Sequence, residues 1–273
     1  MALKFEEYRG IENLVVAELI ETIDENGQIV EEYGDVQPLS GVQQVSGEVN
    51  EASEAHYYDN MAAIVVDSEG EDTYTLVVSI PSKKTRALIE GTTYDEATGA
   101  LIGTKKNKKY FALGFIANKL NGTDEYNWIY KGKFTGGNKT HDTKNDGTDA
   151  TNMEYTFTSI HTSTKFNKGG NCKYLSVDND GKANLSTFFD TVTTPDTLQA
   201  ATPRTLTITQ AQGTTLVVKK NGVSLNTGAT IYDGDELTIT VTGGTVKVNN
   251  ETFTSGNTYT VSGNTTVVST AQA

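Results

Sequence analysis

The segment from Lys105 to Phe134 constrains the fold of this chain more than any other. Its second half alternates between two faces, with Tyr126, Trp128, Tyr130 and Phe134 on one and Asn127, Ile129, Lys131 and Lys133 on the other. A period of two is typical of a β-strand with one buried face. The turn-forming sequence Asn121-Gly122-Thr123-Asp124 joins this strand to an earlier apolar run. The segment therefore predicts a β-hairpin made of two long strands.

The other residues up to position 195 continue this β-rich pattern. An Asn-Gly turn signal separates apolar runs at residues 14–23 and 28–33, which predicts a second hairpin. Further strands are predicted at residues 42–49, 57–66 and 73–80, with the polar segment 50–56 as a connection, and residues 108–162 predict a three-stranded meander. Two helices are predicted, at residues 82–90 before the C-cap Gly91 and at residues 184–192, where Leu185, Phe188, Phe189 and Val192 recur at helical spacing.

The composition changes after a stretch that contains Pro195 and Pro203. We place a linker at residues 196–204, between a first domain at residues 1–195 and a second at 205–273. The second domain contains short Thr- and Val-rich runs separated by turn signals, and it resembles immunoglobulin-like modules. The expected fold class is therefore mainly β: a sandwich or barrel with a flanking helix, followed by a small immunoglobulin-like β-sandwich.

The charge is concentrated at one end of the chain. The net charge is −13, and residues 1–79 alone contain 18 acidic and only 2 basic side chains. Such a surface repels nucleic-acid phosphates, so specific binding of DNA or RNA is not expected. Glu6 and Glu7 lie where a secretory signal needs an apolar core, and no run approaches membrane-spanning length. With Cys172 as the only cysteine, we expect a soluble, disulfide-free protein made in a reducing cytoplasm, without membrane insertion.

The sequence contains no recognisable catalytic constellation. His56, His141 and His161 have no partner at a telling spacing, and neither a nucleophile elbow nor a phosphate-binding loop is present. The run that begins at Asp178 imitates a calcium loop, but its twelfth position is Phe189, where a bidentate Glu is required. We therefore expect no enzyme activity, no cofactor and no metal site.

Several motifs in a fixed order are similar to a known family. They are YYDN (57–60), SIPSKKTRALIEG (79–91), ATGALIG (97–103), FALGF (111–115), WIYKGKF (128–134) and FFDTVTTP (188–195). In this order they resemble the major tail proteins of long-tailed bacteriophages, the siphophages, over roughly residues 1–195. The resemblance implies a tail-tube-type fold whose subunits form hexameric rings, and the rings stack into a tube through which the genome passes. It also implies assembly in the host bacterial cytoplasm, with the tape measure, tail terminator and distal tail proteins as partners, and a final place in the virion tail.

Two groups of residues are candidates for roles in such an assembly. Aromatic residues in the N-terminal arm and before the strand at 57–66 are candidates for the subunit interface, namely Phe5, Tyr8, Tyr57 and Tyr58. The alternative is that these aromatic side chains belong to the subunit's own core. Acidic candidates for the channel lining are Glu31, Glu32, Glu48 and Glu51, because an acidic lumen would let double-stranded DNA slide without sticking.

Two other classes of protein compete with this interpretation. An adhesin or carbohydrate-binding protein made of two β-sandwiches is the main alternative, and a β-rich glycan hydrolase is the less favoured one because it lacks a catalytic constellation. The C-terminal module, whichever class is correct, is expected to act as decoration, either attaching to a cell surface or glycan or serving a purely structural role.

Overall fold

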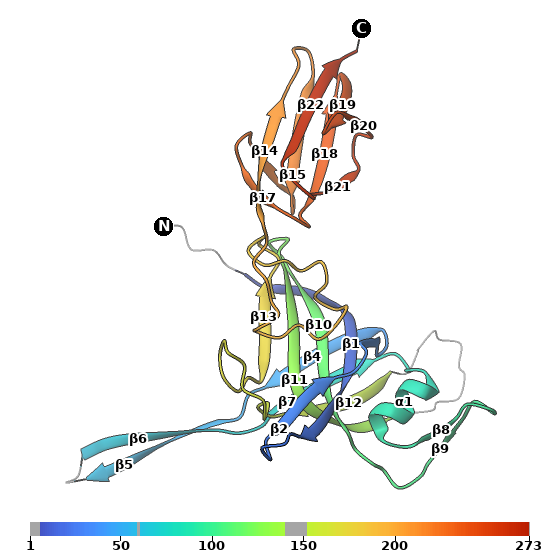
Figure 1. Ribbon diagram of the computed structural model, residues 1–273, viewed down its shortest axis with the longest axis vertical. Helices are drawn as coiled ribbons and strands as arrows, with labels where there is room; N and C mark the ends of the chain where they lie inside the picture. The colour runs from blue at the N-terminus through green and yellow to red at the C-terminus, as the bar shows by residue number, and fades with distance from the viewer. Residues whose placement is uncertain (1–5, 59–60, 140–151, 273) are drawn as a thin grey trace, which may run out of the picture.

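The computed structural model describes residues 6–58, 61–139 and 152–272. It is mainly β, as predicted, with α1 as the one helix among these residues. Two units follow one another along the longest axis of the molecule, the first containing β1 to β13 and α1 and the second containing β14 to β22 (Figure 1). No helix in the described part of the chain is both long and apolar enough to cross a membrane.

The first unit is built around one nine-stranded sheet, whose main path runs β2-β1-β10-β11-β12-β7-β4. Its strands are β1 (Tyr8–Ile23), β2 (Ile29–Tyr33), β3 (Gln37–Pro38), β4 (Val42–Glu48), β7 (Asp72–Val78), β10 (Tyr110–Lys119), β11 (Asp124–Asn138), β12 (Met153–Ser159) and β13 (Tyr174–Asp178). β3 pairs with β1, and β13 pairs with β11. Among the described residues the sheet stays open, because β2 and β4 at the two ends of its path do not pair with each other.

Both predicted hairpins are confirmed. β1 pairs with β2, and the carboxylate of Asp24 accepts backbone N–H groups from Asn26 and Gln28 at 2.8 Å each, which fixes the turn. Gly27 adopts a φ of 78°, the left-handed conformation that an Asn-Gly turn requires. β10, β11 and β12 form the predicted antiparallel meander. The first strand is longer than the predicted run at residues 14–23, and β1 begins at Tyr8.

The central strands are buried on both faces. One hydrophobic cluster contains Leu113, Ile129 and Phe157, and the opposite cluster contains Trp128 and Tyr130 under the chain that follows β12. The prediction that the strand around residues 126–134 buries only one of its faces is therefore wrong. Phe134 lies in the first cluster, away from Trp128, because a β-bulge in the pairing of β10 with β11 shifts the alternation.

The first predicted helix is confirmed, and the second is wrong. α1 (Lys83–Glu90) begins after Ser82, whose hydroxyl accepts the Thr85 N–H at 3.1 Å, and it ends at Gly91 with a φ of 70°. Beside it lie the short paired strands β8 (Thr93–Asp95) and β9 (Ala100–Ile102). Residues 184–192 instead form successive turns.

The turns at residues 184–192 have a physical cause in the strand beneath them. The Phe188 carbonyl accepts the indole N–H of Trp128 at 3.0 Å and the Thr193 hydroxyl at 2.9 Å, so it is engaged outside any helical ladder. The Tyr130 hydroxyl likewise donates to the Thr193 carbonyl at 3.0 Å. The apolar spacing that predicted a helix therefore reflects turns that cover Trp128 and Tyr130.

The second unit is a small β-sandwich, as predicted. Its sheets run β17-β14-β22-β19-β20 and β16-β15-β18-β21, and a hydrophobic cluster that includes Leu206, Ile239 and Val267 lies between them. Its strands are β14 (Pro203–Thr209), β15 (Thr215–Lys220), β16 (Val223–Leu225), β17 (Thr230–Tyr232), β18 (Glu236–Thr242), β19 (Gly244–Val248), β20 (Glu251–Phe253), β21 (Thr258–Thr260) and β22 (Thr265–Ala271). The segment predicted as a linker is largely ordered: Ala201 N–H donates to Lys182 O of the first unit at 2.9 Å, and β14 already begins at Pro203.

Candidate functional site

The most unusual feature of the structure is a two-stranded arm that leaves the first unit. β5 (Glu51–Tyr58) and β6 (Met61–Glu69) pair with each other and with no other strand of the described chain. We call residues 51–69 the arm. An eight-residue strand rises about 3.3 Å per residue, so the arm is about 26 Å long. It projects away from the body at the lower left of Figure 1.

The arm corrects two predictions about this part of the chain. The segment 50–56, predicted as a connection, is mostly the strand β5, and the strand predicted at residues 57–66 is divided between β5 and β6. The Ala, Ser and Glu residues at the start of β5 have weak β propensity, so the sequence carries no clear signal for a strand there. Pairing with the Ile- and Val-containing β6 determines its conformation instead.

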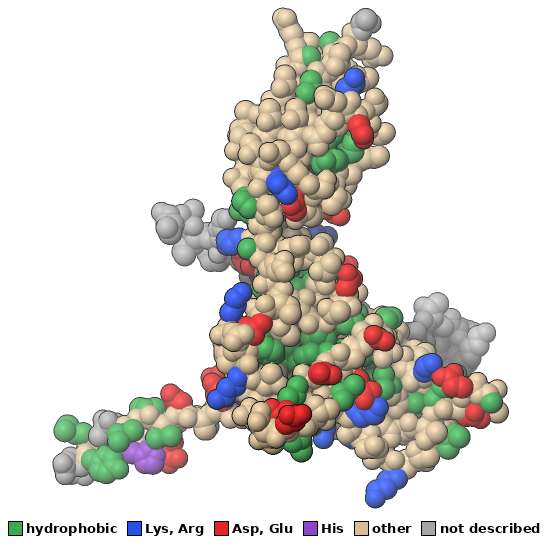
Figure 2. Space-filling view, viewed as in Figure 1, with side chains coloured by type: hydrophobic (Ala, Val, Ile, Leu, Met, Phe, Trp, Pro, Cys, Tyr) green, Lys and Arg blue, Asp and Glu red, His purple; other side chains and the backbone are tan. Residues whose placement is uncertain are grey.

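Large apolar side chains are exposed along the arm. Tyr57 is 69% exposed, Tyr58 60% and Met61 70%, while Ile64 and Val65 are each more than half exposed. Figure 2 shows these side chains gathered at the end of the arm, with acidic side chains beside them. A two-stranded ribbon is marginally stable in water by itself, and a contiguous apolar surface of this kind marks an interaction site.

The base of the arm is fixed to the body. The Lys173 ammonium group donates to a carboxylate oxygen of Asp72 at 3.0 Å and to Gly70 O at 2.9 Å, and both charged side chains are buried. His161 Nε2 lies 3.3 Å from a carboxylate oxygen of Glu69. Gly70 N–H donates to Asn50 O at 2.8 Å, which joins the two strands at their base. These contacts give the arm a defined direction as it leaves the sheet.

The predicted interface tyrosines are all at the surface. Tyr57 and Tyr58 end β5, so the alternative that they belong to the subunit's own core is wrong. Tyr8 begins β1, is 65% exposed, and its hydroxyl donates to Glu125 at 3.1 Å, away from the arm's tip. Phe5 lies outside the described residues.

The predicted channel-lining carboxylates fall into different environments. Glu48 and Glu51 are exposed at the base of the arm, and Glu32 is exposed on β2, at the other end of the sheet path. Glu31 is buried within the subunit, with a side chain only 2% exposed, and therefore cannot line a channel. Its carboxylate accepts Lys131 Nζ at 2.6 Å and backbone N–H groups of Ser163 and Thr164 at 2.9 and 3.0 Å.

The environment of Glu31 predicts a loss of stability in acid. Burial by itself would raise the pKa of Glu31, but the hydrogen bonds from Lys131, Thr164 and Ser163, with the positive charge of Lys131, hold that pKa below its usual range. A depressed folded-state pKa gives stability that is present above the unfolded value of about 4.3 and is lost as the pH falls through the folded value. We expect the free energy of unfolding to decrease below about pH 5. For this one proton the decrease is at most about 1.4 kcal/mol per pH unit.

The measurement is urea unfolding between pH 7 and pH 3, followed by the fluorescence of Trp128, the only tryptophan. The variant Glu31→Gln should be less stable at pH 7 and should show a shallower pH dependence below pH 5. Equal slopes for the two proteins would contradict this assignment.

A second surface, rich in lysine, lies around α1 and the segment between β9 and β10. We call it the lysine surface, and its exposed members are Lys83, Lys84, Lys105, Lys106 and Lys109. Asn107 N–H donates to Gly91 O at 2.8 Å, which holds this segment beside the end of the helix. Sequence reasoning missed this surface, although the run KKNKK at 105–109 was a visible signal.

The charges of the lysine surface are only partly neutralised. Lys84 pairs with Glu96 at 2.7 Å and Lys109 with Glu18 at 2.7 Å. Lys105 and Lys106 make no ion pair with the residues that the structure describes. Burial, with a smaller contribution from the neighbouring Lys106 charge, lowers the pKa of Lys108. The surface is therefore positively charged and open to an acidic partner.

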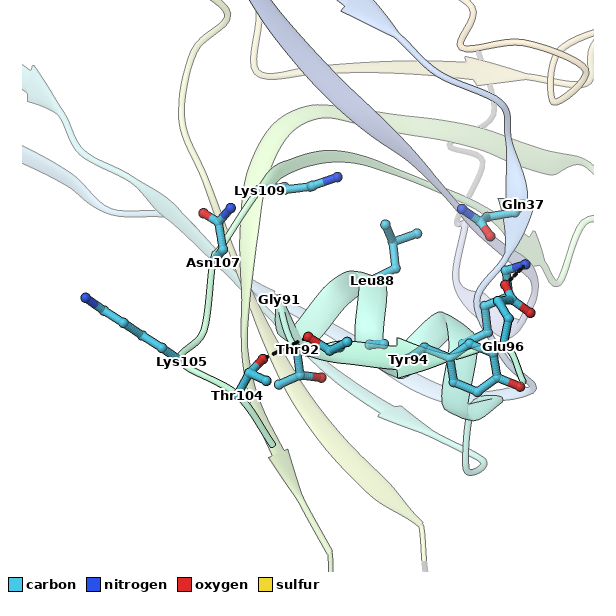
Figure 3. Close-up of a pocket in the computed structure, with 13 residues that line it drawn as sticks. Gln37, Leu88, Gly91, Thr92, Tyr94, Glu96, Thr104, Lys105, Asn107 and Lys109 are labelled. Carbon is cyan, nitrogen blue, oxygen red and sulfur yellow. Dashed lines mark hydrogen bonds and ion pairs between the residues drawn. The ribbon is translucent and has the colours of Figure 1, made fainter. Parts of the chain in front are cut away.

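A cavity of about 540 Å³ opens between α1 and the β8–β9 hairpin on the lysine surface. Ala87, Leu88 and Tyr94 supply apolar wall, and the charged lining consists of Lys84, Lys105 and Lys109 together with Glu96, the ion-pair partner of Lys84. Figure 3 shows Leu88 rising from α1, whereas the long side chain of Lys105 points outward, away from Leu88. The cavity combines an apolar floor with a cationic edge.

The described residues contain no group of three or more His, Cys, Asp or Glu side chains placed to hold a metal ion. No protein-family model matches the chain, and no curated protein is significantly similar to it.

Proposed function

We propose that this protein is a structural subunit whose copies associate through the arm to build a repeating assembly. The observation that carries the proposal is the arm itself, a ribbon with exposed Tyr57, Tyr58 and Met61 that has no packing partner within the described subunit. The outer edges of β2 and β4, which pair with no other strand of the described residues, add to it, since unpaired sheet edges are a hazard unless a neighbour covers them. An exposed apolar arm and unpaired sheet edges have no evident use in an enzyme that acts as a monomer.

We infer further that the assembly is the tail tube of a long-tailed bacteriophage. The order of motifs from residue 57 to residue 195 supports this identification, together with a mainly β first unit that has one flanking helix. In this proposal six copies form a ring, rings stack into a tube, and the second unit decorates the outside. The tape measure, tail terminator and distal tail proteins are the proposed partners during assembly in the bacterial cytoplasm.

The proposed tube carries double-stranded DNA without binding it. Glu32, Glu48 and Glu51 are exposed, and they belong to a first 79 residues in which acidic side chains far outnumber basic ones. DNA has one negative charge for every ~1.7 Å of its axis, so carboxylates along a channel would repel it and prevent sticking. Glu31 is not among the residues proposed for this role, because it is buried.

Negative-stain electron microscopy of the concentrated protein tests the proposal. Rings or tubes of uniform diameter are expected, either spontaneously or after addition of a tail-initiating complex. A protein that stays monomeric under both conditions would contradict the proposal and would favour the alternative of an adhesin or carbohydrate-binding protein. Binding of the isolated monomer to a glycan array would then identify that alternative.

A further inference from the structure

We propose that the arm of one copy docks on the lysine surface of a neighbouring copy, with its tip over the cavity between α1 and the β8–β9 hairpin. This contact rests on the proposed self-assembly and specifies which two surfaces meet. It assigns a role to the cavity and to Lys105 and Lys106, which make no ion pair with the residues that the structure describes.

The arm and the lysine surface carry opposite charges. The arm contains no Lys or Arg in its sequence, and its described carboxylates are all exposed, namely Glu51, Glu54, Asp67 and Glu69. The lysine surface carries Lys105 and Lys106 without ion-pair partners in the described chain. Oppositely charged surfaces attract during encounter and fix the orientation of the complex, whereas two arms would repel each other. The arm therefore fits the lysine surface better than it fits another arm.

The arm and the cavity also both offer apolar groups. The pairing register places Tyr58, Met61 and Ile64 on one face of the arm, with Tyr57 on the other face at the tip. The cavity offers Ala87, Leu88 and Tyr94 as an apolar wall inside a rim of lysines. A tyrosine ring in such a space gains apolar burial and can lie against a lysine ammonium group, which aromatic faces attract.

The positions of the two surfaces favour a contact between different copies. The arm leaves one flank of the first unit, and α1 with the β8–β9 hairpin lies on the opposite flank (Figure 1). Two different surfaces on opposite flanks cannot satisfy each other in a twofold dimer. They produce a head-to-tail contact, which continues from copy to copy and generates either a closed ring or a helical filament. The geometry is thus that of a repeating assembly.

Charge reversal in both surfaces tests the contact. The variant Lys105→Glu/Lys106→Glu and the variant Glu54→Lys/Asp67→Lys are each expected to raise the critical concentration for assembly at least about tenfold at low salt. Combining all four changes should restore assembly, because the arm then carries the positive charges and the lysine surface the negative ones, so the two surfaces attract each other again. The matched control is Lys219→Glu/Lys247→Glu, which makes the same charge change on exposed lysines of the second unit and should assemble normally.

A zero-length carbodiimide reagent gives a direct readout of the contact in the wild-type assembly. Peptides that join Lys105 or Lys106 to Glu54 or Asp67 are expected in mass spectra of assembled protein and not of dilute monomer. The docking contact alone would be overturned if both charge-reversal variants assembled at the same critical concentration as the wild type. It would also be overturned if the fourfold variant assembled no more readily than either double variant. Wild-type protein that never assembles would overturn the proposed function and the contact together.

Discussion

Replacing Tyr57 and Tyr58 with serine is expected to abolish assembly at concentrations where the wild-type protein assembles, while the subunit remains folded. Both side chains are more than half exposed at the end of β5, so their removal takes nothing from the core. Aromatic anchors at the centre of an interface contribute about 2 kcal/mol or more each. Since every ~1.4 kcal/mol is a factor of ten, we expect the critical concentration to rise on the order of several hundredfold.

Light scattering against protein concentration measures this effect, and urea unfolding checks the fold. The matched control is Val223→Ser, which removes a similarly exposed apolar side chain from the second unit and should assemble like the wild type. A double tyrosine variant that unfolds at a lower urea concentration would show that the tyrosines support the subunit. Normal assembly of a folded double variant would show that the arm does not carry the interface.

Replacing Lys131 with alanine is expected to destabilise the first unit by about 3 kcal/mol. Lys131 is 4% exposed, and its ammonium group donates to Glu21 and Glu31 at 2.6 Å each and to the Ser163 hydroxyl at 2.8 Å. The substitution leaves the carboxylate of Glu31 buried without its cation, which costs more than the loss of an exposed ion pair. Trp128, buried on the same strand, reports the unfolding of this unit.

Two comparisons separate the buried charge from other effects. The double variant Lys131→Met/Glu31→Gln should recover much of the lost stability, because it removes both members of the pair and keeps an apolar stem. Lys84→Ala removes an ion pair whose side chains are 71% and 70% exposed, and a change of no more than about 1 kcal/mol is expected. A similarly small change for Lys131→Ala would mean that water or another cation reaches Glu31.

The parts of the fold that the sequence predicted are those specified by local signals. The Asn-Gly turn before β2, the Gly91 cap of α1 and the turn-punctuated strands of the second unit each depend on a few adjacent residues. Such signals act wherever the segment lies in the fold, so a single sequence is enough to locate them.

The errors arose where distant residues decide the structure. The helical spacing at residues 184–192 was misleading because Trp128 takes the Phe188 carbonyl, a contact across 60 positions. The bulge that turns Phe134 to the other cluster depends on the pairing of β10 with β11. Glu31 was indistinguishable from Glu32 in sequence, yet one is buried against Lys131 and the other is exposed.

The candidate site was predicted in part. The sequence identifies Tyr57 and Tyr58 as interface candidates, but it does not predict the ribbon that presents them, because residues 51–55 of β5 are Glu, Ala and Ser, which have weak β propensity. The lysine surface is formed by α1 together with the segment before β10. These two segments become neighbours only in the folded chain, so the sequence alone does not show the surface. Surfaces assembled from separate segments are the least visible in a single sequence.

The parallel pairing of β14 with β22 determines the direction in which the chain leaves the second unit. Because both strands run in the same direction, the chain enters the second unit at one end and leaves it at the other. Ala271 therefore lies at the extremity farthest from the first unit (Figure 1). A peptide epitope or an enzyme joined to the chain after this residue would lie at this extremity of the second unit, far from the arm of the same copy.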